Sequence, residues 1–307
     1  MKHFLTIDDL RRQELVHLLE LSHALRRERQ VGQINEPILA GRTLGMLFAK
    51  PSLRTRVSFE QAMYELGGQA ISLQQSEVGL GARESAGDVA RVLSGMVDGI
   101  MVRVFDHAHL EEMAEGATVP VINALSDTAH PCQPLADLMA LQDEFGMDLS
   151  DRTLAYVGDG NNVARSLART CALMGVRFVI ASPPGYGLEP DLFDQIRQVH
   201  GDAELHSVDD PAEAVRQADA VYTDTWVSMG QEAEQTERAR AFEAFQINDA
   251  LLSNAPDHAI ALHCLPAHRG VEITDAVMDG ARSRVFAQAH NRLHSQKGLL
   301  AILIGQK

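Results

Sequence analysis

Short apolar runs alternate with amphipathic helical stripes along the whole chain, and this alternation constrains the fold more than any other feature. The apolar runs that predict strands are 43–48, 70–73, 100–105, 119–123, 153–157, 178–181, 220–222 and 259–262. Helical stripes separate them, as at 59–66, where apolar residues recur with the spacing i, i+3, i+4, i+7. Because strands that alternate with helices need crossover connections, the sequence predicts an α/β protein with parallel sheets.

The pattern occurs twice, which predicts two domains, each a parallel-sheet α/β sandwich, joined by helices. The 307 residues are enough for two domains of ordinary size. The polar stretch 146–152 is the candidate boundary. We therefore place the domains at 1–147 and 148–285, with a C-terminal helix at 286–307. The two halves look alike in layout, and we find no repeat in their sequences.

Charge and composition argue against several classes of protein. The chain has 27 Lys and Arg against 42 Asp and Glu, a formal net charge of −15, whereas a nucleic-acid or anionic-membrane binder needs a basic face. No run approaches the ~18 apolar residues of a membrane span, and acidic residues precede any apolar N-terminal region, so we expect no signal peptide. Three widely spaced cysteines suggest no disulfide framework, and a cytoplasmic location is expected.

The segment Ser-Leu-Arg-Thr-Arg at 52–56 lies between a predicted strand and a predicted helix. The N–H groups of a helix start attract anions, and the hydroxyls of Ser52 and Thr55 with the guanidinium of Arg54 would complete a phosphate cradle. The Gly-x-x-x-x-Gly-Lys pattern of a P-loop is absent. The alternative is an ordinary serine N-cap followed by solvated arginines.

The segment His-Pro-Cys-Gln-Pro at 130–134 comes directly before a predicted helix, and its two prolines make it stiff. The imidazole of His130 can donate to a carbonyl oxygen, and the amide of Gln133 can both donate and accept. A rigid pair of this kind suits the recognition of an amide-like group. The alternative is that His130 has only a structural role.

The segment Gly-Asp-Gly-Asn-Asn at 158–162 follows a strand and opens a helix, which is the location of a dinucleotide-binding fingerprint. The third glycine of that fingerprint is missing, so the signal for a nucleotide is weak. The asparagines could instead bind a small polar ligand. A tight turn with an asparagine cap is the remaining alternative.

Two later segments also follow predicted strands. The stretch 224–230 begins with Asp224, whose carboxylate could hold an ammonium group or could simply cap a loop. The stretch 263–270 places Cys264 near two histidines, which could indicate a nucleophile or a metal site. The spacing is no standard ligand pattern, and adjacent side chains of a strand point to opposite faces, so we expect no metal.

These five segments occur in one order, and together they resemble the aspartate/ornithine carbamoyltransferase superfamily, on its ornithine side, nearly from end to end. Ser-Met-Gly at 228–230 followed by His-Cys-Leu-Pro at 263–266 separates the ornithine members from the aspartate members. The resemblance implies transfer of the carbamoyl group of carbamoyl phosphate to the δ-amine of L-ornithine, giving L-citrulline and phosphate in arginine metabolism. It also implies a first domain that binds carbamoyl phosphate, a second that binds ornithine, a last helix that packs back on the first domain, and homotrimers or assemblies of trimers. No metal or organic cofactor is expected.

The resemblance also implies roles for single residues. Those that would bind carbamoyl phosphate are Ser52, Leu53 through its backbone N–H, Arg54, Thr55, Arg103, His130, Gln133, Cys264, Leu265 and Arg292. Those that would bind L-ornithine are Asn162, Asp224, Ser228 and Met229. The candidate catalytic residues among them are Arg103, His130, Asp224 and Cys264. We expect Cys264 to be a polar binding group and proton relay, and not a covalent nucleophile.

Two positions depart from the family's usual pattern. Leu53 stands where a threonine is commonest, which removes a hydroxyl and keeps the backbone donor. Gly79 lies in the loop 76–85 where relatives often carry glutamine, and Arg83 is a candidate to compensate. Three other functions stay open: a carbamoyltransferase for another amine, such as putrescine, an N-acylated ornithine or aspartate; a nucleotide-binding protein; and a catalytically idle ornithine binder.

Overall fold

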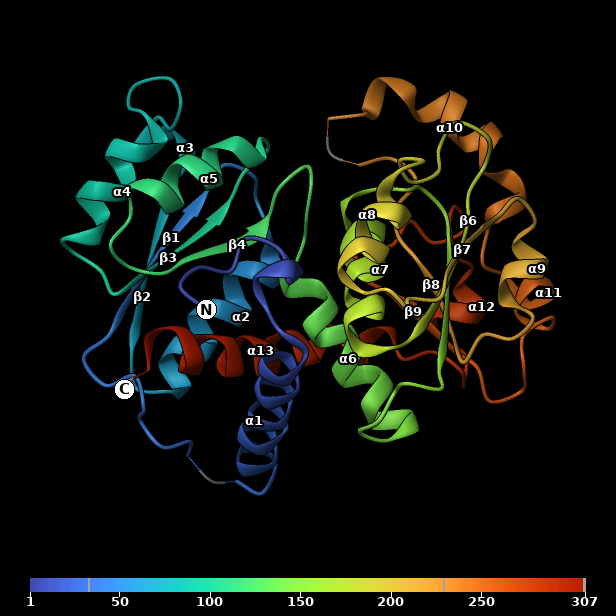
Figure 1. Ribbon diagram of the computed structural model, residues 1–307, viewed down its shortest axis with the longest axis horizontal. Helices are drawn as coiled ribbons and strands as arrows, with labels where there is room; N and C mark the ends of the chain where they lie inside the picture. Colours follow the sequence, from blue (N-terminus) through green and yellow to red (C-terminus); the bar gives the residue numbers. More distant parts are fainter. Residues whose placement is uncertain (33, 229, 306–307) are drawn as a thin grey trace. The chain divides into compact units, whose positions relative to one another are not determined.

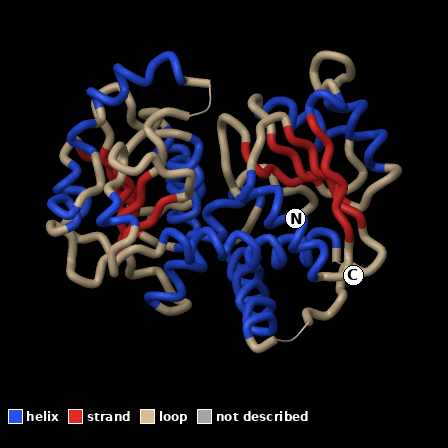
Figure 2. The backbone as a smooth tube through the Cα atoms, turned by 180° about the vertical axis from the view of Figure 1, so that it is seen from behind, coloured by secondary structure: helices blue, strands red, loops and turns tan. Residues whose placement is uncertain are grey.

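The computed structural model describes residues 1–32, 34–228 and 230–305, and the chain divides into two compact units (Figure 1). Unit 1 comprises Met1–Met139 together with the chain from His290 onward, and unit 2 comprises Ala140–Ala289. Each unit contains one sheet whose strand pairs are all parallel. Figure 2 shows helices around the strands of both units. The predicted fold class, two parallel-sheet α/β domains linked by helices, is confirmed.

Unit 1 has a four-stranded sheet in the order β2-β1-β3-β4. Its strands are β1 (Thr43–Phe48), β2 (Gln69–Gln74), β3 (Gly99–Arg103) and β4 (Val121–Leu125). Its helical segments are η1 (Ile7–Asp9), α1 (Arg12–Gln30), α2 (Leu53–Glu65), α3 (Gln75–Val78), α4 (Ala86–Ser94), α5 (His107–Gly116), the start of α6 (Cys132–Phe145) and most of α13 (Val285–Ile304).

Both faces of the unit 1 sheet are covered, which is why the central strands β1 and β3 are buried along their whole length. A cluster of apolar side chains from β1, β3 and β4 packs against α4 and α5. Figure 1 shows α1, α2 and α13 on the other face. The outer strand β2 has only exposed and partly buried residues, as expected at a sheet edge.

Unit 2 has a five-stranded sheet in the order β7-β6-β5-β8-β9. Its strands are β5 (Thr153–Val157), β6 (Arg177–Ala181), β7 (Leu205–Val208), β8 (Ala220–Thr223) and β9 (Ile260–His263). Its other elements are α7 (Asn162–Met174), α8 (Leu192–Val199), α9 (Pro211–Val215), η2 (Glu232–Glu234), α10 (Gln235–Ala241), η3 (Glu243–Phe245), α11 (Asp249–Leu252) and α12 (Asp275–Met278).

The unit 2 core lies mainly between the sheet and α9, α11 and α12, with the aromatic side chains of Trp226, Phe242 and Phe245 at one end. Helices α7 and α8 cover the opposite face (Figure 1). None of the helices in the described parts of the chain is both long and apolar enough to cross a membrane.

Eight strands of the described chain coincide with predicted apolar runs to within two residues at either end. The strand β7 was not predicted. Leu205 is its only fully buried residue, and His206 and Ser207 are exposed, so the segment has neither a continuous apolar run nor regular alternation. Edge strands of this kind are held by the neighbouring backbone more than by their own side chains.

Each unit contains the same kind of polar contact at the start of its first strand. In unit 1, Asp98 accepts from Arg42 Nη1 at 2.7 Å and from the Thr43 amide at 2.8 Å. In unit 2, Asp219 accepts from Arg152 Nη1 at 3.2 Å and from the Thr153 amide at 2.8 Å. Both sequences read Arg-Thr-Leu at the start of the first strand of the unit. The likeness between the halves therefore extends to a short piece of sequence.

A buried polar cluster holds α13 within unit 1. Lys297 is fully buried, and its ammonium donates to Asn35 Oδ1 at 2.5 Å and to Glu65. His294 lies one turn earlier and is 6% exposed. Burial, with the positive charges of Lys297 and Arg26 next, lowers the pKa of His294 to about 4. His294 is therefore a buried, neutral histidine in α13, the helix that also carries Arg292.

This cluster predicts a pH-dependent stability. The pKa of a histidine in an unfolded chain is near 6.5, so the unfolded chain binds the proton first as pH falls. The free energy of unfolding should therefore drop between about pH 6.5 and 4, by up to about 3 kcal/mol from His294 alone. Urea unfolding of the wild type and of His294→Gln at several pH values measures this. The variant should show a shallower loss, whereas His206→Gln, at an exposed position, should follow the wild type. Equal slopes in all three proteins would contradict the assignment.

Candidate functional site

Apart from Arg292 on α13, the predicted site residues lie at or just after the carboxyl ends of three strands in each unit. In unit 1 these strands are β1, β3 and β4, and in unit 2 they are β5, β8 and β9. In the two sheets the order of successive strands reverses between β1 and β3 and between β5 and β8. Ligands of open α/β sheets bind outside the carboxyl ends of the strands at such a reversal. Topology thus gathers residues that are far apart in sequence.

The segment after β1 forms the first turn of α2. Ser52 is the N-cap, and its Oγ accepts from the Thr55 amide at 3.2 Å. Leu53 is the first helical residue, and its side chain is exposed, so it can contribute only its backbone N–H at this end of the helix. The serine N-cap that the sequence offered as the alternative to a phosphate cradle is present. It does not exclude the cradle, because a capped helix N-terminus still attracts anions through its other N–H groups.

Arg292 of α13 joins two other predicted residues of unit 1. Its Nη1 donates to Gln133 Oε1 at 2.8 Å, and its Nη2 lies 3.4 Å from Thr55 Oγ1. Gln133 in turn donates from Nε2 to Asp137 Oδ1 at 2.7 Å. All of these residues are at least 97% buried. Asp137 was not predicted, although its i, i+4 spacing from Gln133 on α6 is a signal that could have found it.

His130 lies in a strongly positive environment. Burial is the largest cause that holds its pKa well below the ordinary histidine value, and three arginines add to the effect, namely Arg292, Arg103 and Arg54. The imidazole is therefore neutral at pH 7, and it can donate one hydrogen bond without carrying charge. The same three arginines create a field that favours an anion. Unit 1 thus brings together the predicted phosphate-binding and carbonyl-binding residues.

Lys50, two residues after β1, was missed by the sequence analysis. Its ammonium lies 3.8 Å from the centre of the Phe105 ring, and the residue is buried. Burial and the nearby charge of Arg103 lower its pKa. Lys50 adds another cationic group to this edge of the unit 1 sheet.

Cys132 lies in the His-Pro-Cys-Gln segment, but its thiol is inert, because burial raises its pKa to about 12.

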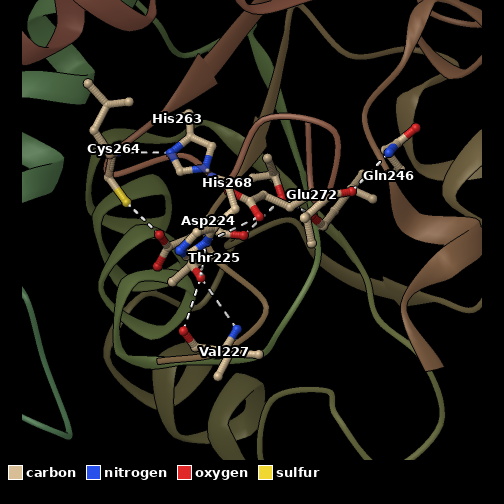
Figure 3. Close-up of polar contacts among 12 residues, drawn as sticks. Asp224, Thr225, Val227, Gln246, His263, Cys264, His268 and Glu272 are labelled. Carbon is tan, nitrogen blue, oxygen red and sulfur yellow. Dashed lines mark hydrogen bonds and ion pairs between the residues drawn. The ribbon is translucent and has the colours of Figure 1, made fainter. Parts of the chain in front are cut away.

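Asp224, directly after β8, is the centre of the predicted residues in unit 2. Its Oδ1 accepts from the Cys264 thiol at 2.9 Å (Figure 3), and its Oδ2 accepts from Asn161 Nδ2 at 2.9 Å. Asn161 Oδ1 also accepts from two amides at the start of α7, so Asn161 is an asparagine cap. Asn162, the predicted residue, is half-buried as the first residue of α7. Asn161, the neighbour of the predicted Asn162, therefore contacts the carboxylate.

Arg238 holds the loop that follows Asp224. Its Nη1 donates to Asp159 Oδ1 and to the carbonyl of Trp226, both at 3.0 Å, and the residue is 6% exposed. Burial raises the pKa of Asp159, against the opposing effect of Arg238. The amide of Ser228, in the same loop, donates to Gln231 Oε1 at 3.0 Å. Met229 lies outside the described residues.

The segment after β9 carries Cys264 and Leu265. Cys264 is 8% exposed, and its thiol donates to the Asp224 carboxylate. One ligand atom each from Asp224, His263 and Cys264 lie within 4.8 Å of one another, a spacing that could hold an ion. Here, however, His263 Nδ1 accepts from the Leu265 amide at 2.8 Å. These contacts make Cys264 a polar partner of Asp224.

Gly79 closes α3 in the left-handed region, with φ of +68°. A Cβ there would lie 2.7 Å from the Cβ of Arg83. The local backbone therefore accounts for the departure from glutamine, because a side chain at this position would be strained.

In the segment 158–162, Gly160 lets the backbone pack closely against the turn at 183–188. The Gly160 amide donates to the carbonyl of Tyr186 at 2.8 Å. A Cβ at Gly160 would lie 2.3 Å from the backbone carbon of Gly187. In a dinucleotide site the second glycine lets a pyrophosphate approach, whereas here the turn at 183–188 occupies that place. The nucleotide-binding alternative loses its main support.

This close approach predicts that Gly160→Ala costs about 1–3 kcal/mol of unfolding free energy, since neither backbone can move cheaply. Gly201→Ala is the matched control, because nothing lies within 4 Å of a Cβ there. Urea unfolding of both variants decides the matter. A Gly160→Ala protein as stable as the control would show that the turn at 183–188 gives way.

Comparison with known proteins covers both units. Residues 2–143 match the family described as aspartate/ornithine carbamoyltransferase, carbamoyl-P binding domain, and residues 150–303 match its Asp/Orn binding domain. Proteins named ornithine carbamoyltransferase are 48% identical over 305 residues in Methanopyrus kandleri (99% of this chain, 97% of the relative) and 50% identical over 303 residues in Gloeobacter violaceus (98% and 95%).

A solved structure agrees with these matches. The ornithine carbamoyltransferase from Pyrococcus furiosus is 44% identical and has a TM-score of 0.95, with 100% of this chain and 98% of that chain covered. The resemblance inferred from the five ordered motifs is thereby confirmed. The chain belongs to the aspartate/ornithine carbamoyltransferase family.

Proposed function

We propose that this protein is an enzyme that transfers the carbamoyl group of carbamoyl phosphate to the δ-amine of L-ornithine, giving L-citrulline and phosphate. The observation that carries the proposal is the convergence of three arginines on the neutral His130, beside the amide of Gln133. This set offers cations for a phosphate and neutral hydrogen-bonding groups for a carbamoyl group. The family membership and the names of the relatives support the same activity.

The substrates would bind as the motifs imply. Residues 1–147 with the helix 286–307 would form the carbamoyl-phosphate domain, and residues 148–285 the ornithine domain. The phosphate would be bound by the α2 N-terminus with Ser52, Leu53, Arg54 and Thr55, and by Arg103 and Arg292. His130 would donate to the carbonyl oxygen, and Gln133 would accept from the carbamoyl amide. Cys264 and Leu265 are the remaining residues that the resemblance assigns to carbamoyl phosphate.

Ornithine would be held through its amino-acid end. The Asp224 carboxylate would bind the α-ammonium group, and the Asn162 amide, with Ser228 and Met229, would complete this end of the site. The thiol of Cys264 holds one oxygen of Asp224, which supports its role as a polar binding group and relay. Asn161 orients the other oxygen, so the carboxylate is fixed before the substrate arrives.

The reaction would begin with attack of the neutral δ-amine on the carbonyl carbon. A free alkyl amine has a pKa near 10, and the arginine-rich surroundings favour its neutral form. Negative charge then develops on the carbonyl oxygen, where Arg103, His130 and Thr55 would donate hydrogen bonds. The carbon–oxygen bond to phosphate breaks, the phosphate takes the electron pair, and the proton lost by the amine ends on the departing phosphate. Loss of one such donor typically lowers the rate ~10²–10³-fold.

A substrate panel tests the proposal against the other amines. Citrulline or the matching carbamoyl product is measured with ornithine, putrescine, N-acetylornithine and aspartate in parallel, each with carbamoyl phosphate. The proposal expects turnover with ornithine far above the other three. Preference for another amine would overturn the ornithine assignment and keep the carbamoyl-phosphate half, whereas silence with all four would indicate an idle homologue.

We also propose a homotrimeric assembly. Leu53, Val57 and Tyr64 form an exposed apolar stripe on one face of α2, and Ile71 on the neighbouring edge strand β2 is 47% exposed. Apolar side chains gathered in this way mark protein interfaces more often than free surface. Sedimentation equilibrium should give three times the monomer mass or a multiple of it, and Tyr64→Lys should lower that mass. A wild-type monomer would contradict the proposal.

The cellular setting is proposed to be the cytoplasm, with a role in arginine biosynthesis. Cys132, Cys171 and Cys264 are buried as thiols and are not joined to one another, which fits a reducing compartment. The proposed product, citrulline, carries a new ureido group, and arginine synthesis would consume it.

A further inference from the structure

A buried pair of side chains lies behind the segment that carries Cys264. His263 and Glu272 are both fully buried. Glu272 Oε1 contacts His263 Nε2 at 3.1 Å and accepts from the His268 amide at 2.5 Å (Figure 3). The proposed mechanism uses neither residue, and the sequence analysis assigned neither a role. A buried carboxylate placed against a buried histidine calls for an explanation, because both groups cost free energy to bury.

The contacts of the ring specify one arrangement of the proton on His263. The Leu265 amide lies 2.8 Å from His263 Nδ1. An amide can only donate, so Nδ1 is the acceptor and the proton of a neutral ring is on Nε2, where it is donated to Glu272. The carboxylate therefore selects the tautomer that leaves Nδ1 available to Leu265.

Leu265 has an unusual backbone. Its φ is +60°, in the left-handed region that residues other than glycine seldom adopt. Such a conformation persists only when the surrounding structure holds it. The bond from the Leu265 amide to His263 is a direct hold on this residue, and the His263 amide is itself held by Gln288 Oε1 at 2.9 Å. The preceding residue, Cys264, donates to Asp224.

We propose that Glu272 is a positioning residue for the ornithine end of the site. Through the tautomer of His263 it holds the left-handed turn at Leu265, and this turn aims the Cys264 thiol at Asp224. Glu272 touches no substrate. The inference deepens the proposed function and rests on it, because Asp224 and Cys264 are there the groups that contact ornithine.

Two substitutions of Glu272 separate positioning from bulk stability. Glu272→Gln keeps an oxygen that accepts from His263 and His268, so the tautomer and the turn should remain. Glu272→Leu removes the acceptor. The matched control is Asp219→Leu, since Asp219 also accepts from a histidine, His258 Nε2 at 2.9 Å, and from a backbone amide at 2.8 Å. Asp219 lies at the amino end of β8, away from the carboxyl ends that carry the site.

The expected kinetic result is specific to one substrate. Glu272→Leu should lower kcat/KM for ornithine by up to about 10²-fold, as misplacement of a binding group by about 1 Å does. Inhibition by inorganic phosphate, which reports on the arginine site of unit 1, should stay unchanged. Glu272→Gln and Asp219→Leu should keep kcat/KM for ornithine close to the wild-type value. Unchanged ornithine kinetics in Glu272→Leu, or an equal loss in Asp219→Leu, would overturn the inference.

A second measurement follows the path through His263. His263→Asn keeps an acceptor near the position of Nδ1 and removes the contact with Glu272. If Glu272 acts through His263, Glu272→Leu should cause little further loss in the His263→Asn background, whereas additive losses would contradict it. If Glu272→Leu does not fold, His263→Gln replaces it, because this variant loses the Nδ1 acceptor and keeps a donor for Glu272. His263→Gln should show the same selective loss of kcat/KM for ornithine. Wild-type ornithine kinetics in this variant would overturn the inference.

The tautomer can be observed without turnover. The ¹⁵N resonances of His263 in the full chain, assigned by comparison with His263→Asn, should show the proton on Nε2 in the wild type and in Glu272→Gln. A proton on Nδ1 would overturn the inference even in an active enzyme. Absence of citrulline formation by the wild type, with the expected tautomer present, would instead reject the proposed function.

Discussion

Replacement of Arg292 by methionine should lower kcat/KM for carbamoyl phosphate by about 10²- to 10³-fold, the usual cost of a lost donor to a developing charge. The guanidinium joins Gln133 and Thr55, so its loss removes a cation from the phosphate site and frees the Gln133 amide to reorient. Steady-state kinetics with carbamoyl phosphate varied at saturating ornithine measures the effect. Inhibition by inorganic phosphate should weaken in parallel.

The control for this variant is Arg284→Met. Arg284 makes an ion pair with Glu144, and both side chains are partly exposed. Pairs of this type contribute little, at most about 1 kcal/mol, so the control should keep its kinetics. If Arg292→Met kept wild-type kcat/KM while remaining folded, the cluster around His130 would not be the carbamoyl-phosphate site.

The second large effect is expected at Asp224. Asp224→Asn removes the charge that would bind the α-ammonium and keeps the shape, so kcat/KM for ornithine should fall by about 10²- to 10³-fold, as when one partner of a buried ion pair is lost. Carbamoyl-phosphate protection against thermal unfolding should persist, because the arginines that would bind its phosphate lie in unit 1.

Asp210→Asn is the matched substitution, because Asp210 caps α9 and asparagine caps a helix as well as aspartate does. Its kinetics should equal those of the wild type. An Asp224→Asn enzyme that loses carbamoyl-phosphate binding and keeps its apparent affinity for ornithine would reverse the assignment of the two halves.

The sequence predicted the fold well because the central strands are buried on both faces. Such strands appear as continuous apolar runs, and β1 and β5 matched their predicted runs to the residue. The edge strand β7 has no such run and could not be predicted from its own residues. The sequence therefore predicts a strand where burial of its own side chains stabilises it, and not where pairing with the backbone of a neighbouring strand does.

The candidate site was only partly predictable. Motifs placed the groups at strand ends, but the contacts that orient those groups depend on the tertiary structure. Arg238 reaches Asp159 across 79 residues, and Cys264 reaches Asp224 across 40. The contact of Asn161 with Asp224 was also not predicted, because it depends on the cap geometry at the start of α7.

The most direct test of the account follows the carbamoyl carbon itself. The protein is incubated with ¹³C-carbamoyl phosphate and L-ornithine, without added metal or nucleotide, and the products are identified by NMR. The account predicts ¹³C in the ureido carbon of citrulline, bonded to the δ-nitrogen, with one phosphate released for each citrulline. Phosphate release without labelled citrulline, or label attached to the α-nitrogen, would contradict it.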